Sequence, residues 1–68
     1  MIEVYKTTIS DSEIAANIIN IIQMKYPEAK ITIDLEDCDK ILRIENHEIQ
    51  NSEIQQLVTE FGCMCEVL

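Results

Sequence analysis

Residues 30–44 read KITIDLEDCDKILRI, and this stretch decides the fold. Its first six residues alternate between polar and apolar side chains, which is typical of a strand with one face in water. Residues 36–39 then form a polar turn, and the rest of the stretch returns as a second strand with Leu42 and Ile44 facing inward. The stretch therefore predicts a β-hairpin in the middle of the chain.

A strand and a helix are predicted before this hairpin. Residues 2–9 are rich in β-branched and aromatic types, which favour a strand. Residues 10–13 (SDSE) match a capping box, in which the Ser10 hydroxyl accepts an amide hydrogen bond and Glu13 reaches back to the cap. The helix that begins there carries apolar residues at helical spacing: Ile14, Ala15, Ile18, Ile19, Ile22 and Tyr26. Pro27 ends it, because the residue before a proline disfavours the helical conformation.

A second helix and a last strand are predicted after the hairpin. Asn51 or Ser52 caps a short helix whose inner face is apolar at helical spacing: Ile54, Leu57, Val58 and Phe61. Gly62 follows, at the place where a helix end favours a residue free to adopt a positive φ. Residues 63–68 close the chain as a strand.

The order of these elements predicts one α+β domain over residues 1–68. It is that of the ferredoxin-like βαββαβ sandwich, in which two helices cover one face of a four-stranded antiparallel sheet. In that fold the turns at residues 10–14, 36–39 and 61–63 all lie at one edge. We therefore expect these three turns to meet.

Composition narrows the classes of function. Thirteen acidic residues against five basic ones give a formal net charge of −8, which excludes a nucleic-acid binder because such proteins need a basic surface. No apolar run reaches the roughly 18 residues of a spanning helix, so we expect no membrane insertion. The N-terminal residues lack the pattern of a secretory signal, which predicts a cytoplasmic protein. Three cysteines, an odd number, favour free thiols over disulfides.

Short matches to one family are spread over nearly the whole chain. They are residues 9–14 (ISDSEI) at the first helix, Pro27 at its end, residues 33–34 (ID) and 39–42 (DKIL) in the hairpin, and residues 61–62 (FG) before the last strand. Through them the chain resembles the heavy-metal-associated domain family, which comprises copper chaperones and the small N-terminal domains of copper-transporting ATPases. It looks closest to the short, free-standing bacterial members. The resemblance implies the ferredoxin-like fold.

The most specific motif of that family, the Met-x-Cys-x-x-Cys metal loop, is absent. Counted back from Asp34, the two cysteines of the motif fall on Asp11 and Ile14, and Ile9 takes the place of its methionine. Family members hold Cu(I) between two thiolates, and neither an isoleucine nor a hard carboxylate oxygen replaces a soft sulfur ligand. We therefore expect no ordinary copper site and no cofactor, with residues 10–13 serving to start the helix.

The cysteines leave a second interpretation open. Cys63 begins the last strand at the edge where the family binds metal, and Cys65 follows on the same face of that strand. With Cys38 on the hairpin turn and Asp11 nearby, they are candidate ligands for Cu(I) or Zn. The competing interpretation is that Cys63 and Cys65 pack in the core, since cysteine is among the most buried residue types.

The remaining candidates favour a binding module over an enzyme. The single histidine, His47, is predicted at the far edge from every cysteine, so no nucleophile–base pair is expected. Acidic residues gather at the turn edge, as either a solvated edge or a docking face for a basic partner: Asp11, Glu13, Asp34, Glu36, Asp37 and Asp39.

The leading hypothesis is thus a non-catalytic, heavy-metal-associated-like domain with a degenerate metal site that works as a protein-interaction module. It binds another protein, or a second copy of itself as a homodimer, through the acidic edge or by strand addition at an outer strand. The alternative is a heavy-metal binding or delivery protein that uses the relocated thiols of Cys63 and Cys65.

Overall fold

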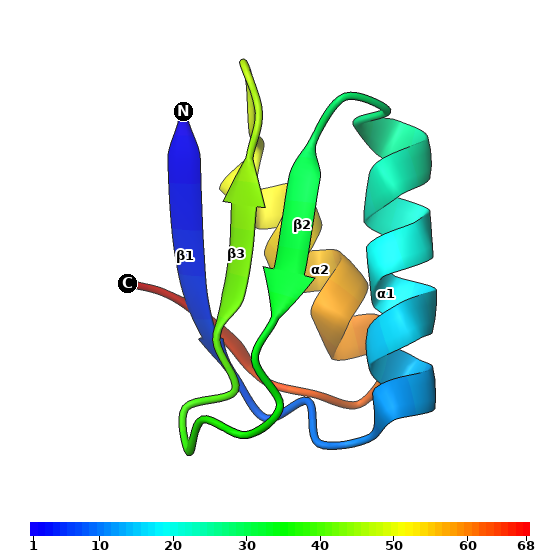
Figure 1. Cartoon of the computed structure of the whole chain (residues 1–68), viewed down its shortest axis with the longest axis vertical. Coiled ribbons are helices and arrows are strands. Elements are labelled where there is room, and N and C mark those ends of the chain that lie inside the picture. Colours follow the sequence, from blue (N-terminus) through cyan, green and yellow to red (C-terminus); the bar gives the residue numbers. More distant parts are fainter.

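Four strands and two helices follow one another in the predicted order. They are β1 (Ile2–Thr7), α1 (Ser12–Lys25), β2 (Lys30–Ile33), β3 (Leu42–Glu45), α2 (Asn51–Glu60) and β4 (Cys65–Val67), in a computed structural model that describes all of residues 1–68. The sheet has the strand order β2-β3-β1-β4, and every neighbouring pair is antiparallel. Both helices lie on the same side of this sheet (Figure 1). The predicted ferredoxin-like α+β fold is confirmed.

The core fills the space between the sheet and the helices. The register aligns Ile33 of β2, Leu42 of β3 and Tyr5 of β1 in one row on the helix-covered face. The helices contribute six buried side chains: Ala15, Ile18, Ile22, Ile54, Leu57 and Val58. Burying a large aliphatic side chain of this kind stabilises the fold by roughly 2 kcal/mol. The predicted inward faces of the two helices and of β3 are confirmed except at Ile19 of α1, which is half-buried but does not pack against the core.

All four strands are shorter than the sequence predicted, because the ladders become irregular at one end of the sheet. There the Thr7 amide donates to the carbonyl of Asp39 (3.0 Å), and the Thr8 amide donates to the carbonyl of Met64 (3.3 Å). β1 therefore ends at residue 7, although Ile9 beyond it is fully buried. The prediction for residues 2–9 is therefore correct in their apolar character and wrong in the length of the strand.

The predicted cap of α1 is wrong in detail. The capping residue is Asp11 and not Ser10, because Oδ1 of Asp11 accepts the amides of Glu13 (2.7 Å) and Ile14 (3.3 Å). A carboxylate makes stronger hydrogen bonds than a hydroxyl and also interacts favourably with the positive end of the helix dipole. Ser10 and Asp11 could each accept the first amides of the helix, and the charged Asp11 does so.

The cap predicted for α2 is also wrong. Gln50 holds the cap position without a side-chain hydrogen bond, and Asn51 is the first helical residue. The side-chain oxygen of Asn51 instead accepts the hydroxyl of Tyr5 at 2.6 Å. Tyr5 is fully buried, and this burial, with a smaller effect of Glu3, raises the pKa of its hydroxyl well above the ordinary value. Leaving a buried hydroxyl unpaired costs more than leaving an exposed helix end uncapped.

The predicted helix ends agree with the structure. α1 ends at Lys25, two residues before Pro27. Gly62 follows α2 with a φ of 81°, in the left-handed region that glycine adopts without strain. Neither helix has the length and the apolar character that crossing a bilayer requires.

Candidate functional site

Three loops meet at one end of the molecule, at the bottom of Figure 1. They are the loops that follow β1, β2 and α2. The loops are residues 8–11, 34–41 and 61–64. The predicted meeting of the three turns is therefore confirmed. We call this region the acidic end.

Two neighbouring threonines hold the loops of the acidic end together. Thr7 is buried, and its hydroxyl donates to the carbonyl of Lys40 (2.6 Å) while accepting the amide of Ile9 (3.2 Å). The hydroxyl of Thr8 accepts the amide of Met64 (2.9 Å). The loop after β1 is thus tied both to the hairpin turn and to the approach to β4. The sequence analysis missed this role of the two threonines.

Three aspartates of the acidic end also shape its turns. Besides the cap formed by Asp11, the Oδ1 atom of Asp34 accepts the amides of Glu36 (3.1 Å) and Asp37 (3.2 Å). Oδ1 of Asp37 in turn accepts the amide of Asp39 at 2.8 Å. Aspartate favours such turns because its short side chain reaches backbone amides two or three residues ahead. These carboxylates are therefore fixed in position.

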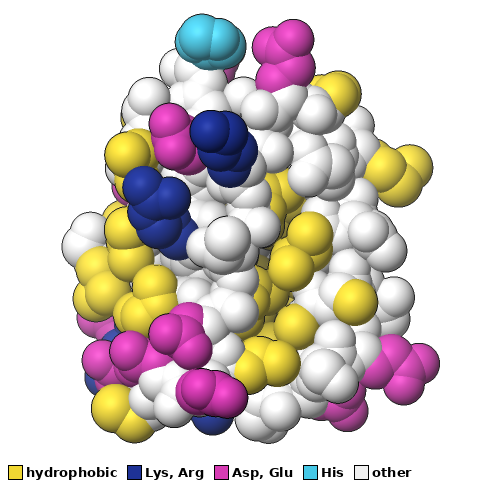
Figure 2. Space-filling view, viewed as in Figure 1, with side chains coloured by type: hydrophobic (Ala, Val, Ile, Leu, Met, Phe, Trp, Pro, Cys, Tyr) yellow, Lys and Arg dark blue, Asp and Glu magenta, His cyan; other side chains and the backbone are white.

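Acidic side chains outnumber basic ones at the acidic end. Asp39 makes its one ion pair, with Lys6 at 3.7 Å, and the Lys40 ammonium donates to a backbone carbonyl. Glu13 and Glu36 are exposed and make no ion pair. Figure 2 shows carboxylates gathered at this end of the molecule, and further carboxylates beside the upper Lys and Arg side chains and near the histidine at the top. Acidic side chains thus predominate at this end, whereas the exposed sheet face carries both signs of charge, as the Arg43–Glu45 pair shows.

The positions that the resemblance would place in a metal loop have structural roles. Ile9 is fully buried, and Ile14 is half-buried and packs against the core. Asp11 caps α1. None of the three offers a sulfur ligand at the start of the helix.

The three cysteines are free thiols at different places. Cys38 is exposed on the hairpin loop, while Cys63 and Cys65 are half-buried and pack against the core. Burial raises the pKa of the Cys65 thiol to about 11. The raised pKa lowers the fraction of thiolate, which is the form of cysteine that acts as a nucleophile and as a metal ligand.

Cys38 gathers with acidic neighbours rather than with the other thiols. Its sulfur and the carboxylates of Asp37 and Asp39 lie within 4.8 Å of one another, the one group of three such ligands in the chain. Cys63, Cys65 and Asp11 lie outside it. The sequence analysis did not foresee this group, although the local triplet DCD was its signal. One thiolate with two hard carboxylates does not match what Cu(I) prefers.

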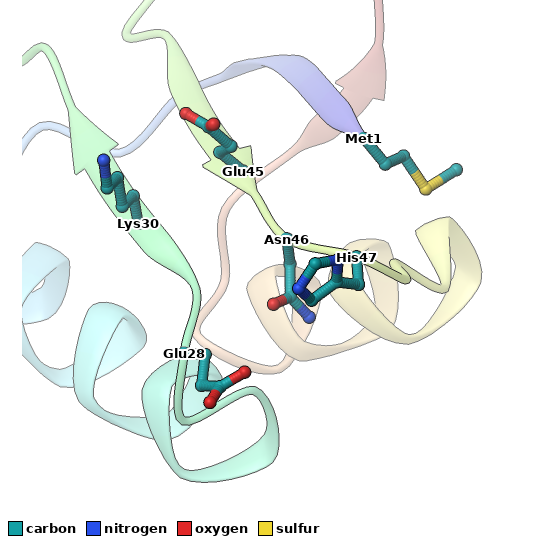
Figure 3. Close-up of a pocket in the computed structure, with 6 residues that line it drawn as sticks. All are labelled: Met1, Glu28, Lys30, Glu45, Asn46 and His47. Atoms are coloured by element: carbon teal, nitrogen blue, oxygen red, sulfur yellow. The ribbon is translucent and has the colours of Figure 1, made fainter.

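The opposite end of the molecule carries a shallow hollow of about 210 Å³. Its walls are Met1, Glu28, Lys30, Glu45, Asn46 and His47. The lysine and the two glutamates in Figure 3 point in different directions, and His47 lies beside Asn46. A catalytic or metal site needs side chains that converge on one point, and this hollow lacks that arrangement. His47 is exposed and follows β3, which runs away from the acidic end, so it lies at the opposite end as predicted.

No family model, curated protein or solved structure matches this chain. The resemblance to heavy-metal-associated domains therefore stays a hypothesis that rests on the residues quoted for it.

Proposed function

We propose that this chain is a small, non-catalytic protein-interaction domain that resembles heavy-metal-associated domains and binds a basic protein partner through its acidic end. The observation that carries the proposal is the gathering of carboxylates on the loops of one end. Six carboxylates lie on the loops of one end or beside them, and one of the six is ion-paired. A surface of one sign steers a partner of the opposite sign and selects against others.

The loops of the acidic end suit recognition because they are held in place. Three of the four aspartates there, Asp11, Asp34 and Asp37, accept backbone amides. Glu13 and Glu36 have no such partner, so their carboxylates are free to contact a lysine or an arginine. A fixed frame lowers the entropy lost when a partner binds.

The proposal is tested with a short oligolysine peptide and charge-matched variants. The variant Glu13→Gln/Glu36→Gln removes two charges at the acidic end, while Glu28→Gln/Glu48→Gln removes two exposed charges elsewhere. At low salt we expect the first variant to bind the peptide about fivefold more weakly and the second to bind nearly as the parent does. Equal weakening in both variants would show attraction by net charge alone and would overturn the proposal.

The alternative function is binding or delivery of Cu(I) or Zn through Cys63 and Cys65. What favours it is that Cys63 lies at the acidic end beside the loop where the family binds metal. The raised pKa of Cys65 argues against it, because burial favours the protonated thiol. A metal site here would have to draw both sulfurs out of their contacts with the core. We therefore rank it second.

A further inference from the structure

One outer strand, β2, presents unpaired backbone groups. Hydrogen bonding in an antiparallel ladder alternates along the strand, and the Asp34 amide donates to the Ile41 carbonyl of the neighbouring chain segment at 2.9 Å. By this alternation Lys30 and Thr32 also bond to β3, whereas the N–H and C=O groups of Ile31 and Ile33 point away from the sheet. These groups are free to pair with another strand.

The sequence of β2 is complementary to itself when the strand meets a second copy. Around a two-fold axis at Thr32, each Ile31 faces the Ile33 of the other copy, and both use their outward backbone groups. In the same register each Lys30 faces the Asp34 of the other copy, and the two Thr32 side chains face each other. Opposite charges and paired threonines are favourable cross-strand neighbours in antiparallel sheets.

The other outer strand does not share this property. The Leu68 amide donates to the Val4 carbonyl at 2.9 Å, so the outward groups of β4 belong to Cys65 and Val67. Pairing two copies of β4 through these groups about its central residue sets Glu66 opposite Glu66. Like charges in direct opposition destabilise a strand pair. Self-pairing is therefore specific to β2.

Helix α1 offers a second, independent observation. It packs mainly on β2, whereas α2 packs on β4. Ile21 of α1 lines a groove with Leu57 of α2, and Ile19 lies about 160° away around the helix. Ile19 is half-buried but is not among the side chains that pack against the core. It thus leaves apolar surface on the side of α1 that lies beyond the free edge of β2.

We infer that two copies of this chain form a homodimer by antiparallel pairing of β2 with β2 about Thr32. The two sheets join into one, and the two α1 helices meet near Ile19. The inference goes beyond binding of a basic partner. The two surfaces share Asp34 but are tested through different residues. Glu13 and Glu36 test the basic partner and Lys30 tests the dimer, so either proposal can fail without the other.

The test is amide hydrogen exchange followed as a function of protein concentration. At about 0.15 M salt, which screens the repulsion between two chains of net charge −8, we expect the amides of Ile31 and Ile33 to become protected as concentration rises. The amides of Cys65 and Val67, outward on β4, are the internal control and stay unprotected. Sedimentation over the same range should show a monomer–dimer equilibrium. A monomer at every concentration, or protection on β4 instead, would overturn the inference.

Matched charge variants test the register. In Lys30→Asp, the new aspartate of each copy faces the Asp34 of the other copy, so like charges oppose each other on both sides of the axis. We therefore expect the dimer dissociation constant to rise about tenfold or more. Lys6→Asp changes the net charge equally and lies on β1, away from the paired edge. It should leave dissociation within about twofold of the parent. Equal weakening by both variants would contradict the register, and unchanged exchange of the core amides verifies that each variant is folded.

Discussion

Replacing Asp11 with alanine tests how the first helix starts. The Asp11 carboxylate accepts two backbone amides, at 2.7 and 3.3 Å. Losing such a cap costs about 1 kcal/mol of unfolding free energy, to which the lost dipole interaction adds a few tenths. In a domain of this size that corresponds to a fall of about 5 °C in Tm. Thermal and urea unfolding followed by circular dichroism measure both quantities.

Two further variants make this prediction specific. Asp11→Asn keeps an acceptor and removes the charge, so it should cost less than Asp11→Ala. Ser10→Ala changes an exposed residue that is not the cap, and its effect should lie within about 0.5 kcal/mol of zero. If Ser10→Ala destabilised the protein as much as Asp11→Ala, the helix would begin with the capping box and the reasoning would be refuted.

Three other predictions concern stability and thiol chemistry. Thr7→Val should cost about 1–3 kcal/mol in urea unfolding, because it removes the donor to the Lys40 carbonyl and leaves the buried amide that it accepted unpaired. Gly62→Ala should cost about 1 kcal/mol by the same measurement, since φ is 81° and an added Cβ meets nothing within 4 Å; an unchanged stability would contradict the backbone argument. Burial raises the pKa of Cys65 to about 11, so between about pH 9 and 11 the folded chain keeps a proton that the unfolded chain has lost. Stability should therefore fall as pH rises through that window, less steeply in Cys65→Ser, and iodoacetamide at pH 8 should modify the exposed Cys38 far faster than Cys65.

The order of elements and the inward faces could be predicted because they depend on local periodicity. The alternation around Ile31 and Ile33 fixed the hairpin, and the helical spacing from Ile14 to Ile22 fixed which face of α1 is buried. Pro27 and Gly62 marked helix ends through backbone sterics that need no tertiary contact.

What the sequence could not predict depends on competition or on distant contacts. Ser10 and Asp11 are both good capping residues. Which of them is the cap depends on where the loop before the helix ends, and a shift of one residue changes the answer. Asn51 leaves its predicted cap because a buried hydroxyl 46 positions earlier in the chain needs its oxygen. The threonine bonds of the acidic end likewise join segments far apart in the sequence, as that between Thr7 and Lys40 shows.

The candidate site was predicted in its place and in its charge, but not in its details. The meeting of three turns followed from the fold, and the carboxylates there followed from the sequence. The grouping of Cys38 with its two acidic neighbours depends on the backbone of the loop, where Lys40 adopts a φ of 45°. That conformation has no clear signal in the residue types.

The central claim is that residues 10–13 form a plain helix start and not a site for a soft metal ion, and a competition for metal ions tests this claim most directly. Fully reduced protein is titrated with Cu(I), and in parallel with Zn(II), against a chelator of known affinity. We expect no complex tighter than an isolated surface thiol forms, and no difference between the parent chain and Cys63→Ser. A tight stoichiometric complex that Cys63→Ser abolishes and Cys38→Ser retains would contradict the account.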